Sequence, residues 1–263
     1  MEDYRNVLRE FDPISLDEMN AVKLMNRIDT KYVVPMRLLA VLLRKSLNDY
    51  YVQEFDSLRV ATYDTMYFDT DDLDMYLRHH DRQLVRQKIR VRQYVDSHLN
   101  FLEIKRKNNK GRTKKKRIPL PQPDISVRTD EVADFIAAKS RYTYEQISPK
   151  LRTTFHRITL VNRQKTERLT IDLDLTFYNQ TTGIVRTLDD VVIVELKRDG
   201  NCFSPMIGIM LEERVKPLKI SKYCIGTALT TPHCKYNRFK KKIRAIQKLS
   251  AIAPQPYPLN SKP

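Results

Sequence analysis

Basic and aliphatic residues alternate along residues 85–94, and the alternation predicts a β-strand. Lys88, Arg90 and Arg92 occupy every second position, and Ile89 and Val91 stand between them. Successive side chains of a strand point to opposite faces, so the three cations share one face and the aliphatic residues share the other. This stretch therefore predicts a strand with one strongly basic face.

The alternation continues through two further predicted strands that end at residue 120. Phe101, Glu103, Lys105 and Lys107 share one face of the second strand, and a turn at residues 108–111 leads into the third. Nine of the thirteen residues from 105 to 117 are basic, and none is acidic. Like charges on neighbouring strands repel each other. The three strands therefore predict a polyanion that lies along the basic face.

Periodic patterns on both sides of these strands predict the remaining elements. A capping-box pattern from Ser15 to Glu18 predicts the start of a helix that runs to about residue 26. Further strands are expected at residues 27–34, 58–69, 153–161, 168–178, 184–188 and 191–197. Helices are expected at residues 35–48, 129–139, 142–147, 204–213, 221–229 and 236–249, with a short polar helix or turn at 71–80.

Charged residues at alternate strand positions predict a polar interior. Arg157, Asp172 and Glu195 stand among aliphatic residues, and isolated charges are not buried in a dry core. About eight antiparallel strands of this kind can line a water-filled barrel, because inward and outward positions alternate in a barrel. We therefore expect an α+β fold, an antiparallel β-barrel tunnel of about eight strands with flanking helices. The inward cations are expected to be Lys31, Lys88, Arg90, Arg92, Lys105 and Lys115.

The charge balance supports a phosphate-rich partner. The chain of 263 residues holds 48 Lys and Arg against 32 Asp and Glu, a formal net charge of +16 at pH 7. With 41% hydrophobic residues, it fits one domain over residues 1–263, with a core at about 20–230. A basic helix and a proline-rich tail are expected at 235–263, either as a solvated helix face or as an arm that contacts anionic lipid or nucleic acid.

Several classes of protein are disfavoured by the sequence. The N-terminus lacks an apolar core of signal-peptide type, and no apolar run reaches the length that spans a bilayer, so a cytoplasmic protein is expected. Three widely spaced cysteines predict free thiols. The chain holds five glycines and neither a P-loop nor a GxGxxG motif, so side chains must bind any phosphate.

The few inward acids suggest a divalent metal shared with phosphate oxygens. Glu195 is the first candidate ligand, because carboxylate oxygens bind Mg²⁺ or Mn²⁺. Asp172 and Asp174 are expected either to support the metal or to pair with Arg157 or Arg168. His79 and His80 are adjacent and point in different directions on a regular element, so they are not expected to share a metal.

A series of short motifs follows in order along most of the chain. They are Arg27-x-Asp-x-Lys31-Tyr, Tyr67-Phe-Asp-Thr, Lys88-Ile-Arg90-Val-Arg92, Glu103-Ile-Lys105, Lys115-Lys-Arg117, Arg157, Asp172-Leu-Asp174, Glu195-Leu-Lys197 and Lys219-Ile-Ser221-Lys222. The series resembles the catalytic domain of the vacuolar transporter chaperone (VTC) complex. That domain is a polyphosphate polymerase of the triphosphate tunnel metalloenzyme, or CYTH-like, superfamily.

The resemblance implies an activity and a set of site residues. The activity is transfer of the γ-phosphoryl group of ATP to inorganic polyphosphate, with Glu195 holding Mn²⁺ or Mg²⁺. A membrane-protein partner that receives the polymer is also implied, which would place the chain at the edge of a membrane complex. The implied catalytic residues are Lys31, Arg90, Arg92, Lys105 and Arg157. The implied substrate-binding residues are Lys88, Lys115, Arg117, Lys197, Lys219, Ser221 and Lys222.

One departure separates this sequence from the hydrolytic relatives, which carry an ExExK signature on the first strand. Here the stretch is Arg27-Ile-Asp29-Thr-Lys31, so a base replaces the first carboxylate and water activation loses a candidate general base. This favours a polymerase over a triphosphatase of the same superfamily, and a binding module without turnover is the third alternative. Nucleic acid is disfavoured as the ligand, because the basic strands show no sign of the stacking aromatic residues of single-strand binders.

The remaining cations of the basic strands are expected to be solvent-exposed surface charges. They are Arg86, Arg106, Lys110, Lys114 and Lys116.

Overall fold

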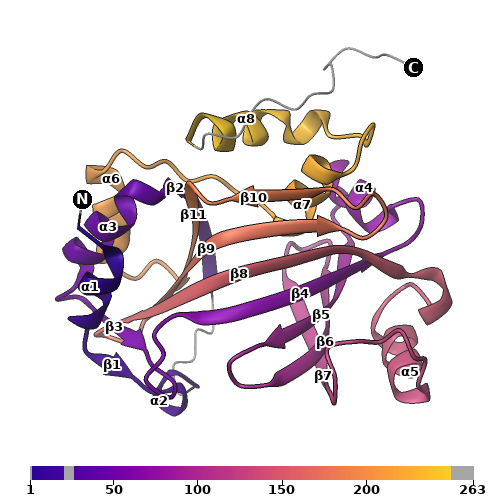
Figure 1. Ribbon diagram of the computed structural model, residues 1–263, viewed down its shortest axis with the longest axis horizontal. Coiled ribbons are helices and arrows are strands. Elements are labelled where there is room, and N and C mark those ends of the chain that lie inside the picture. Colours follow the sequence, from indigo (N-terminus) through magenta and orange to yellow (C-terminus); the bar gives the residue numbers. More distant parts are fainter. Residues whose placement is uncertain (1, 21–26, 250–263) are drawn as a thin grey trace.

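The computed structural model describes residues 2–20 and 27–249, and its centre is a strongly curled antiparallel sheet (Figure 1). Eight strands form one hydrogen-bonded path, and its end strands, β2 and β7, do not pair with each other. The sheet therefore curls into a barrel-like tunnel without closing. In order along the path the strands are β2 (Arg27–Pro35), β11 (Val191–Asp199), β9 (Glu167–Asn179), β8 (Ser148–Asn162), β4 (Ala61–Asp69), β5 (Arg86–Tyr94), β6 (Leu99–Lys107) and β7 (Thr113–Leu120).

Three short strands extend this sheet, and the helices surround it. The short strands are β1 (Pro13–Ile14), β3 (Tyr50–Gln53) and β10 (Val185–Leu188). The α-helices are α1 (Tyr4–Arg9), α2 (Leu16–Asn20), α3 (Leu39–Ser46), α4 (Asp74–His80), α5 (Asp130–Lys139), α6 (Pro205–Glu212), α7 (Lys222–Thr230) and α8 (Lys240–Leu249). None of the helices in the described residues is long and apolar enough to cross a membrane.

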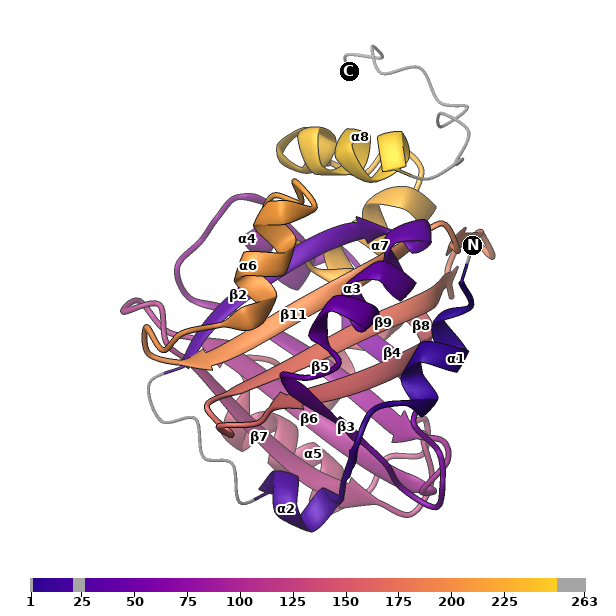
Figure 2. The same ribbon diagram turned by 90° about the vertical axis from the view of Figure 1, so that its left-hand side faces the viewer.

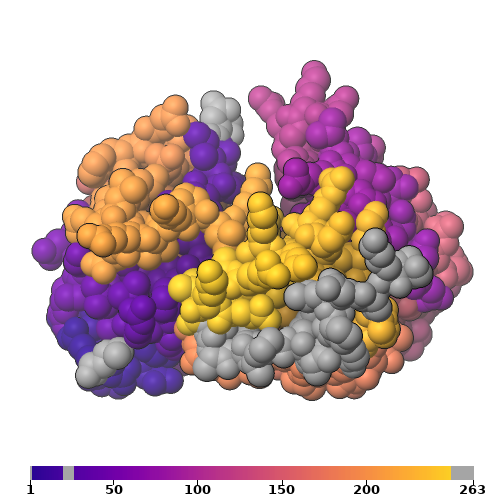
Figure 3. All heavy atoms as spheres, turned by 90° about the horizontal axis from the view of Figure 1, so that it is seen from above, coloured from indigo at the N-terminus to yellow at the C-terminus, as the bar shows by residue number. Residues whose placement is uncertain are grey.

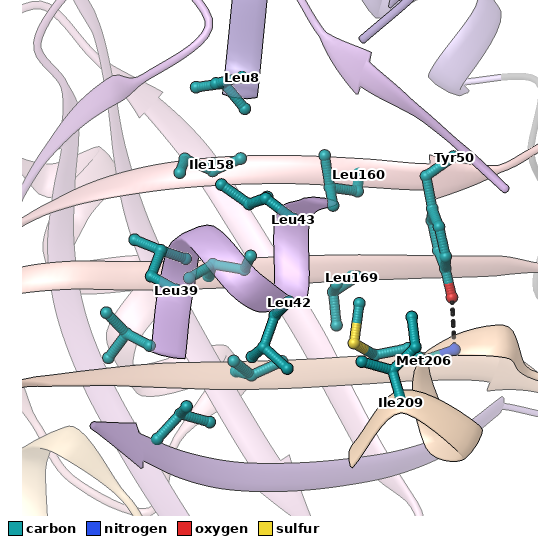
Figure 4. Close-up of a cluster of buried hydrophobic side chains, with 14 of the residues drawn as sticks. Leu8, Leu39, Leu42, Leu43, Tyr50, Ile158, Leu160, Leu169, Met206 and Ile209 are labelled. Atoms are coloured by element: carbon teal, nitrogen blue, oxygen red, sulfur yellow. Dashed lines mark hydrogen bonds between the residues drawn. The ribbon is translucent and has the colours of Figure 1, made fainter. Parts of the chain in front are cut away.

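The largest hydrophobic core lies on the outer face of the curled sheet. Helices α1, α3 and α6 cover the outer face of β8, β9 and β11 (Figure 2). Leu42 and Leu43 of α3 pack in one buried cluster with Leu169 of β9 (Figure 4). The Tyr50 hydroxyl accepts a hydrogen bond of 3.1 Å from the N–H of Met206, which ties β3 to the start of α6. Because the apolar positions face outward, the alternating charged positions are left for the inner face.

A β-bulge in β9 changes which residues face inward. The pairing of β8 with β9 shifts in register at this point, and Asp174 has a φ of 53°. Leu173 packs in the outer core, whereas Leu175 and Phe177 pack against α7. Asp172 therefore points inward while Asp174, two residues later, does not share its face.

Helix α7 fills one end of the concave side, so that end holds an apolar core in place of water. Ile225 and Ala228 of α7 pack against Leu175 and Phe177 of β9 in one buried cluster. Gly226 allows this close approach, because an added Cβ would lie 2.5 Å from the ring of Phe177. The helix begins at the Ser221 N-cap, so its first residues stand at the border between this core and the open part of the tunnel.

The sequence predicted most of these elements. The capping box at Ser15 and Glu18 is present, and the helix it begins is described to residue 20; residues 21–26 lie outside the described part. The tail beyond residue 249 also lies outside it. The helix expected at 142–147 is wrong in type, because the structure has a single 3₁₀ turn at Tyr144–Gln146. Elements α1, β1 and β3 were not anticipated.

Candidate functional site

The open part of the tunnel is a cavity of about 710 Å³ with a cationic lining. Every site residue expected from the sequence lines it, with the exception of Lys219. The lining residues among those expected are Lys31, Lys88, Arg90, Arg92, Lys105, Lys115, Arg117, Arg157, Glu195, Lys197, Ser221 and Lys222. Lys219 is exposed, and its carbonyl accepts a hydrogen bond of 2.6 Å from the Lys242 ammonium. The tunnel expected from the strand pattern is therefore present, and Lys219 stands outside it.

Three carboxylates hold half of the cavity's cations in place, and each lies between two of them. We call these groups the carboxylate clusters. The first is centred on Glu103, which is fully buried between β5 and β7. Its carboxylate accepts hydrogen bonds from Arg90, with the shorter at 2.5 Å, and from Lys115 at 2.9 Å. Burial raises the pKa of Glu103, but the charges of Arg90, Arg92 and Lys115 outweigh it and hold the pKa well below the usual range.

The second carboxylate cluster is centred on Asp172 of β9, which is almost fully buried. Arg157 of β8 binds Asp172 through two nitrogens, at 2.5 and 2.9 Å. Lys222, the first residue of α7, binds the same carboxylate. Burial opposes ionisation of Asp172, yet Arg157 and Lys222 lower its pKa below its ordinary value. Of the two alternatives for Asp172, the structure shows the ion pair; Asp174 instead bonds His156 at 2.9 Å and does not line the cavity.

The third carboxylate cluster is centred on Glu195 of β11. Lys31 of β2 lies 2.5 Å from Oε1, and Lys197 lies 3.7 Å from Oε2. Although burial raises the pKa of Glu195, Lys197 and Lys31 lower it to well below the usual range. Glu195 is therefore a carboxylate anion at neutral pH, with one oxygen beyond hydrogen-bond distance of a lysine.

Glu195 fits a metal that is held jointly by protein and substrate. Within residues 2–20 and 27–249, no group of three or more His, Cys, Asp or Glu side chains could hold a metal. Mg²⁺ is commonly bound by one or two carboxylates together with substrate phosphates. The second oxygen of Glu195 can supply the one carboxylate. The other inward acids, which the sequence also suggested for metal binding, hold cations instead.

Arg27 of the lining pairs with Asp29, but five other cations of the lining form no salt bridge with a carboxylate in the described part of the chain. We call them the unpaired cations: Lys88, Arg92, Lys105, Arg117 and Arg168. The charges of Arg90 and Arg92, together with burial, lower the pKa of Lys105 to about 5. Burial and the charges of Arg90 and Arg157 lower the pKa of Arg92. Burial and repulsion by neighbouring cations therefore disfavour the charged forms of Lys105 and Arg92.

Aromatic rings support the guanidinium groups. The Arg117 guanidinium carbon lies 4.2 Å from the ring centroid of Phe101, and that of Arg92 lies 5.3 Å from the ring of Tyr63. Aromatic rings therefore stand beside the basic residues of the cavity, which the sequence pattern had not indicated. Their faces are covered by arginines, however, so they orient cations and do not form an open platform for bases.

Ser221 and Lys88 connect α7 to the basic strands. The Lys88 ammonium donates a hydrogen bond of 2.6 Å to the Ser221 hydroxyl. The same hydroxyl caps α7 by accepting from the N–H of Cys224 at 3.3 Å. Ser221 thus holds both the helix and a lysine of the lining.

Sequence reasoning missed Arg168 as a lining residue and the clamping role of Glu103; for Asp172 it offered the ion pair as one of two alternatives. Arg168 has the same parity along β9 as Asp172 and lies directly opposite Lys197 of β11. This shared parity could have identified Arg168 from the sequence. Which cations Glu103 and Asp172 hold could not be read, because that depends on which strands become neighbours.

Comparisons with known proteins place the chain in a family. Residues 26–231 match the VTC domain family. A candidate adenylate cyclase from Vibrio parahaemolyticus aligns with a TM-score of 0.46 and 7% identity, over 77% of this chain and 99% of that one. A candidate adenylyl cyclase from Hippeastrum, described as having a dominant triphosphatase activity, aligns with a TM-score of 0.46 and 15% identity, over 79% and 98%.

A conserved protein from Pyrococcus furiosus aligns with a TM-score of 0.38 and 12% identity, over 73% and 96%. The search of curated proteins gives no match. The family match spans most of the chain and includes every residue of the cavity lining described above from Arg27 to Lys222. This protein belongs to the VTC domain family.

Proposed function

We propose that this protein transfers the γ-phosphoryl group of ATP to the end of an inorganic polyphosphate chain inside the cationic cavity. The supporting observation is the state of the acids that line the cavity. Asp29 binds Arg27 at 2.5 Å, Asp96 accepts from the N–H of Thr62 at 2.5 Å, and Glu195 binds Lys31 at 2.5 Å. Each lining acid therefore already has an oxygen in a hydrogen bond or ion pair, and the lysines that lower the pKa of Glu195 make it a weak base toward water, whereas a terminal phosphate is already an anionic nucleophile.

The reaction needs positioning and charge neutralisation more than it needs a nucleophilic side chain. A terminal oxygen of the polyphosphate forms a bond to the γ-phosphorus of ATP. The bond from that phosphorus to the β–γ bridging oxygen breaks, and its electron pair stays on the ADP that leaves. No proton has to be moved in this step.

The two sets of cations have different tasks in this scheme. Arg90 and Arg157 are fixed by buried carboxylates, so they present donors to phosphate oxygens without moving. Arg92 and Lys105 lack a carboxylate, so phosphate oxygens supply their missing counter-charge. Glu195 would hold the divalent metal, which when bound supplies further neutralisation of phosphate charge.

Hydrolysis of a triphosphate is the second candidate, and Lys105 favours it. With a pKa of about 5 in the free cavity, its amine is neutral at pH 7. A neutral amine can accept the proton of a water that attacks the γ-phosphorus, with inorganic phosphate and the diphosphate as products. A bound phosphate chain beside Lys105 raises its pKa again, which weakens this alternative.

The test is incubation with ATP and either Mn²⁺ or Mg²⁺, followed by gel separation stained for polyphosphate and a parallel assay of free phosphate. We expect a polymer ladder and ADP. The matched controls are Arg92→Gln in the cavity and Arg106→Gln on the outer face of β6, of which only the first should stop polymer formation. Free phosphate without polymer would instead establish the triphosphatase.

A further inference from the structure

The basic rows of the cavity continue past its end at the α7 side. In the pairing of β5 with β6, Lys88 lies opposite Lys105, and both line the cavity. The next residues of the same parity, Arg86 and Lys107, also lie opposite each other. Since side chains two apart on a strand share a face, the row of cations runs outward beyond the last lining pair. Arg86 was expected to be an exposed surface charge, but it is only partly exposed.

Two cations from other elements complete this row. The segment before α7 lies beside β2, where the N–H of Leu218 bonds the carbonyl of Lys31 at 2.7 Å, and Lys219 is exposed at its outer side. Lys242 of α8 reaches the carbonyl of Lys219 at 2.6 Å. We call Arg86, Lys107, Lys219 and Lys242 the external row. Figure 3 shows a cleft between the side holding α6 and β2 and the side holding β5 to β7, with α8 along its edge.

The external row brings four positive charges together. None of its four residues forms a salt bridge with a carboxylate in residues 2–20 and 27–249. Burial and the charges of Arg86 and Lys219 lower the pKa of Lys107. Burial lowers the pKa of Lys242 as well, and Arg82 and Lys219 lower it further. These cations repel each other across three elements, so an anion that spans them would relieve the repulsion.

The opposite end of the cavity is chemically different. There Tyr94 lies opposite Leu99 at the far end of the β5–β6 ladder, and the lining also includes Leu16 and Asp96. The matching ends of β2, β9 and β11 add Arg27, Arg168 and Lys197, of which Arg27 pairs with Asp29 and Lys197 lies beside Glu195. Most cations of this end therefore have an acid nearby, whereas the four of the external row form no salt bridge with an acid of the described residues.

We infer that the external row binds the part of a linear inorganic polyphosphate that extends out of the cavity, so that long chains are held at more points than a triphosphate. The inference rests on the proposed function for the nature of the polyanion. The external row continues the rows of cations that line the cavity. One extended phosphate chain can therefore contact both sets of cations, which a lipid surface cannot do.

The test compares two triple variants that remove the same kinds of charge. Arg86→Gln/Lys107→Gln/Lys242→Gln removes three of the four positive charges of the external row. Arg106→Gln/Lys114→Gln/Lys116→Gln removes one arginine and two lysines from the exposed outer face of β6 and β7. Binding of tripolyphosphate and of long-chain polyphosphate is measured by calorimetry over a range of salt concentrations, without ATP, so that the result does not depend on turnover.

We expect the first variant to bind long chains at least about tenfold more weakly at low salt, with tripolyphosphate binding unchanged. Its slope of log affinity against log salt should decrease by about 2, since each contact with a single-stranded polyanion contributes about 0.7. The milder Lys242→Gln should show about one third of that change in slope, which keeps the test informative if the triple variant unfolds.

Three results would overturn the inference: equal weakening for tripolyphosphate and long chains, equal weakening in the outer-face variant, or unchanged binding of both ligands. Binding to phosphatidylserine–phosphatidylcholine vesicles is measured in parallel. Loss of vesicle binding with unchanged polyphosphate binding would assign the row to a membrane surface instead. A wild-type protein that makes no polymer from ATP, yet shows the expected chain-length dependence, would reject the proposed function and leave the external row standing.

Discussion

The carboxylate clusters and the unpaired cations line the same cavity, but their neighbours shift the pKa of their arginines in opposite directions. In the clusters, buried acids stabilise their arginines: burial lowers the pKa of Arg90 and Arg157, yet their partners Glu103 and Asp172 raise it above the ordinary value. Arg92, which has no acid partner, has its pKa lowered by burial and by neighbouring cations. The charges of the first set are stabilised by the protein itself, whereas those of the second set are stabilised only when an anionic ligand binds.

The contrast explains how a tunnel can be strongly cationic and still fold. Three acids, of which Glu103 and Asp172 are buried, fix the positions of six cations and form a frame. The unpaired cations then stand in this frame as charges that only an incoming anion can neutralise. Phosphate binding should therefore stabilise the fold chiefly through the unpaired cations, and loss of a cluster should damage the fold itself.

The largest effect is expected from removing a cluster centre. Asp172→Asn leaves Arg157 and Lys222 buried without a counter-charge, so the free energy of unfolding should fall by about 3–5 kcal/mol in urea denaturation. Asp64→Asn is the control: Asp64 pairs with the half-exposed Arg152 outside the cavity, and the expected loss is under about 1 kcal/mol. Similar losses in the two variants would remove the distinction between cluster and surface acids.

The next effect concerns activity without loss of stability. Arg92→Gln removes a buried cation that forms no salt bridge within the described residues; it donates a hydrogen bond of 3.2 Å to Thr65 and lies over aromatic rings. We expect kcat to fall by about 10²-fold or more, as for loss of one preorganised donor, while the melting temperature stays equal or rises. A fall in melting temperature as large as that of Asp172→Asn would show that Arg92 is part of the structural frame.

A smaller effect is expected in the pH dependence of binding. Lys105 is neutral at pH 7 in the free cavity, because its pKa is about 5, and a bound phosphate chain raises that pKa. Binding therefore takes up a proton, and tripolyphosphate affinity should fall as pH rises from about 6 to 8, by up to about tenfold per pH unit.

Comparison of the wild type with Lys105→Met isolates this proton uptake. Tripolyphosphate changes its own ionisation in the same way with both proteins, so the difference between them comes from Lys105. Calorimetry in two buffers of different ionisation enthalpy counts the protons directly. The wild type should take up more protons than Lys105→Met. Equal proton uptake would show that Lys105 keeps its charge in the free cavity.

The smallest effect is expected from replacing Lys115, the solvent-exposed partner of Glu103. Lys115 bonds Glu103, but its side chain is 42% exposed, so solvent screens the pair. Lys115→Gln should change the free energy of unfolding by less than about 1 kcal/mol and weaken tripolyphosphate binding only a few-fold. Arg90→Gln, at the buried arm of the same acid, should be several times more destabilising in the same urea titration. Equal losses of unfolding free energy in the two variants would mean that burial does not decide how much Lys115 and Arg90 contribute to stability.

The sequence was most informative where a property depends only on neighbours along the chain. The shared face of Lys88, Arg90 and Arg92 follows from the two-residue period of a strand, and the structure places all three in the cavity. The Ser204 cap that begins α6 is equally local and was also predicted. The bulge at Asp174 defeated the same logic, because one extra residue reverses the faces and the sequence of β9 gives no mark of it.

The basic face of the strands, and the need of its charges for a polar interior and an anion, could be derived from the amino-acid sequence. Those conclusions follow from residue type and periodicity, which are local. The folded structure was needed to show which acid holds which cation, that Lys219 lies outside the cavity, and that α7 fills one end of the tunnel. These features depend on strand order, register and helix packing, which bring together residues such as Asp172 and Lys222 that lie far apart in the chain.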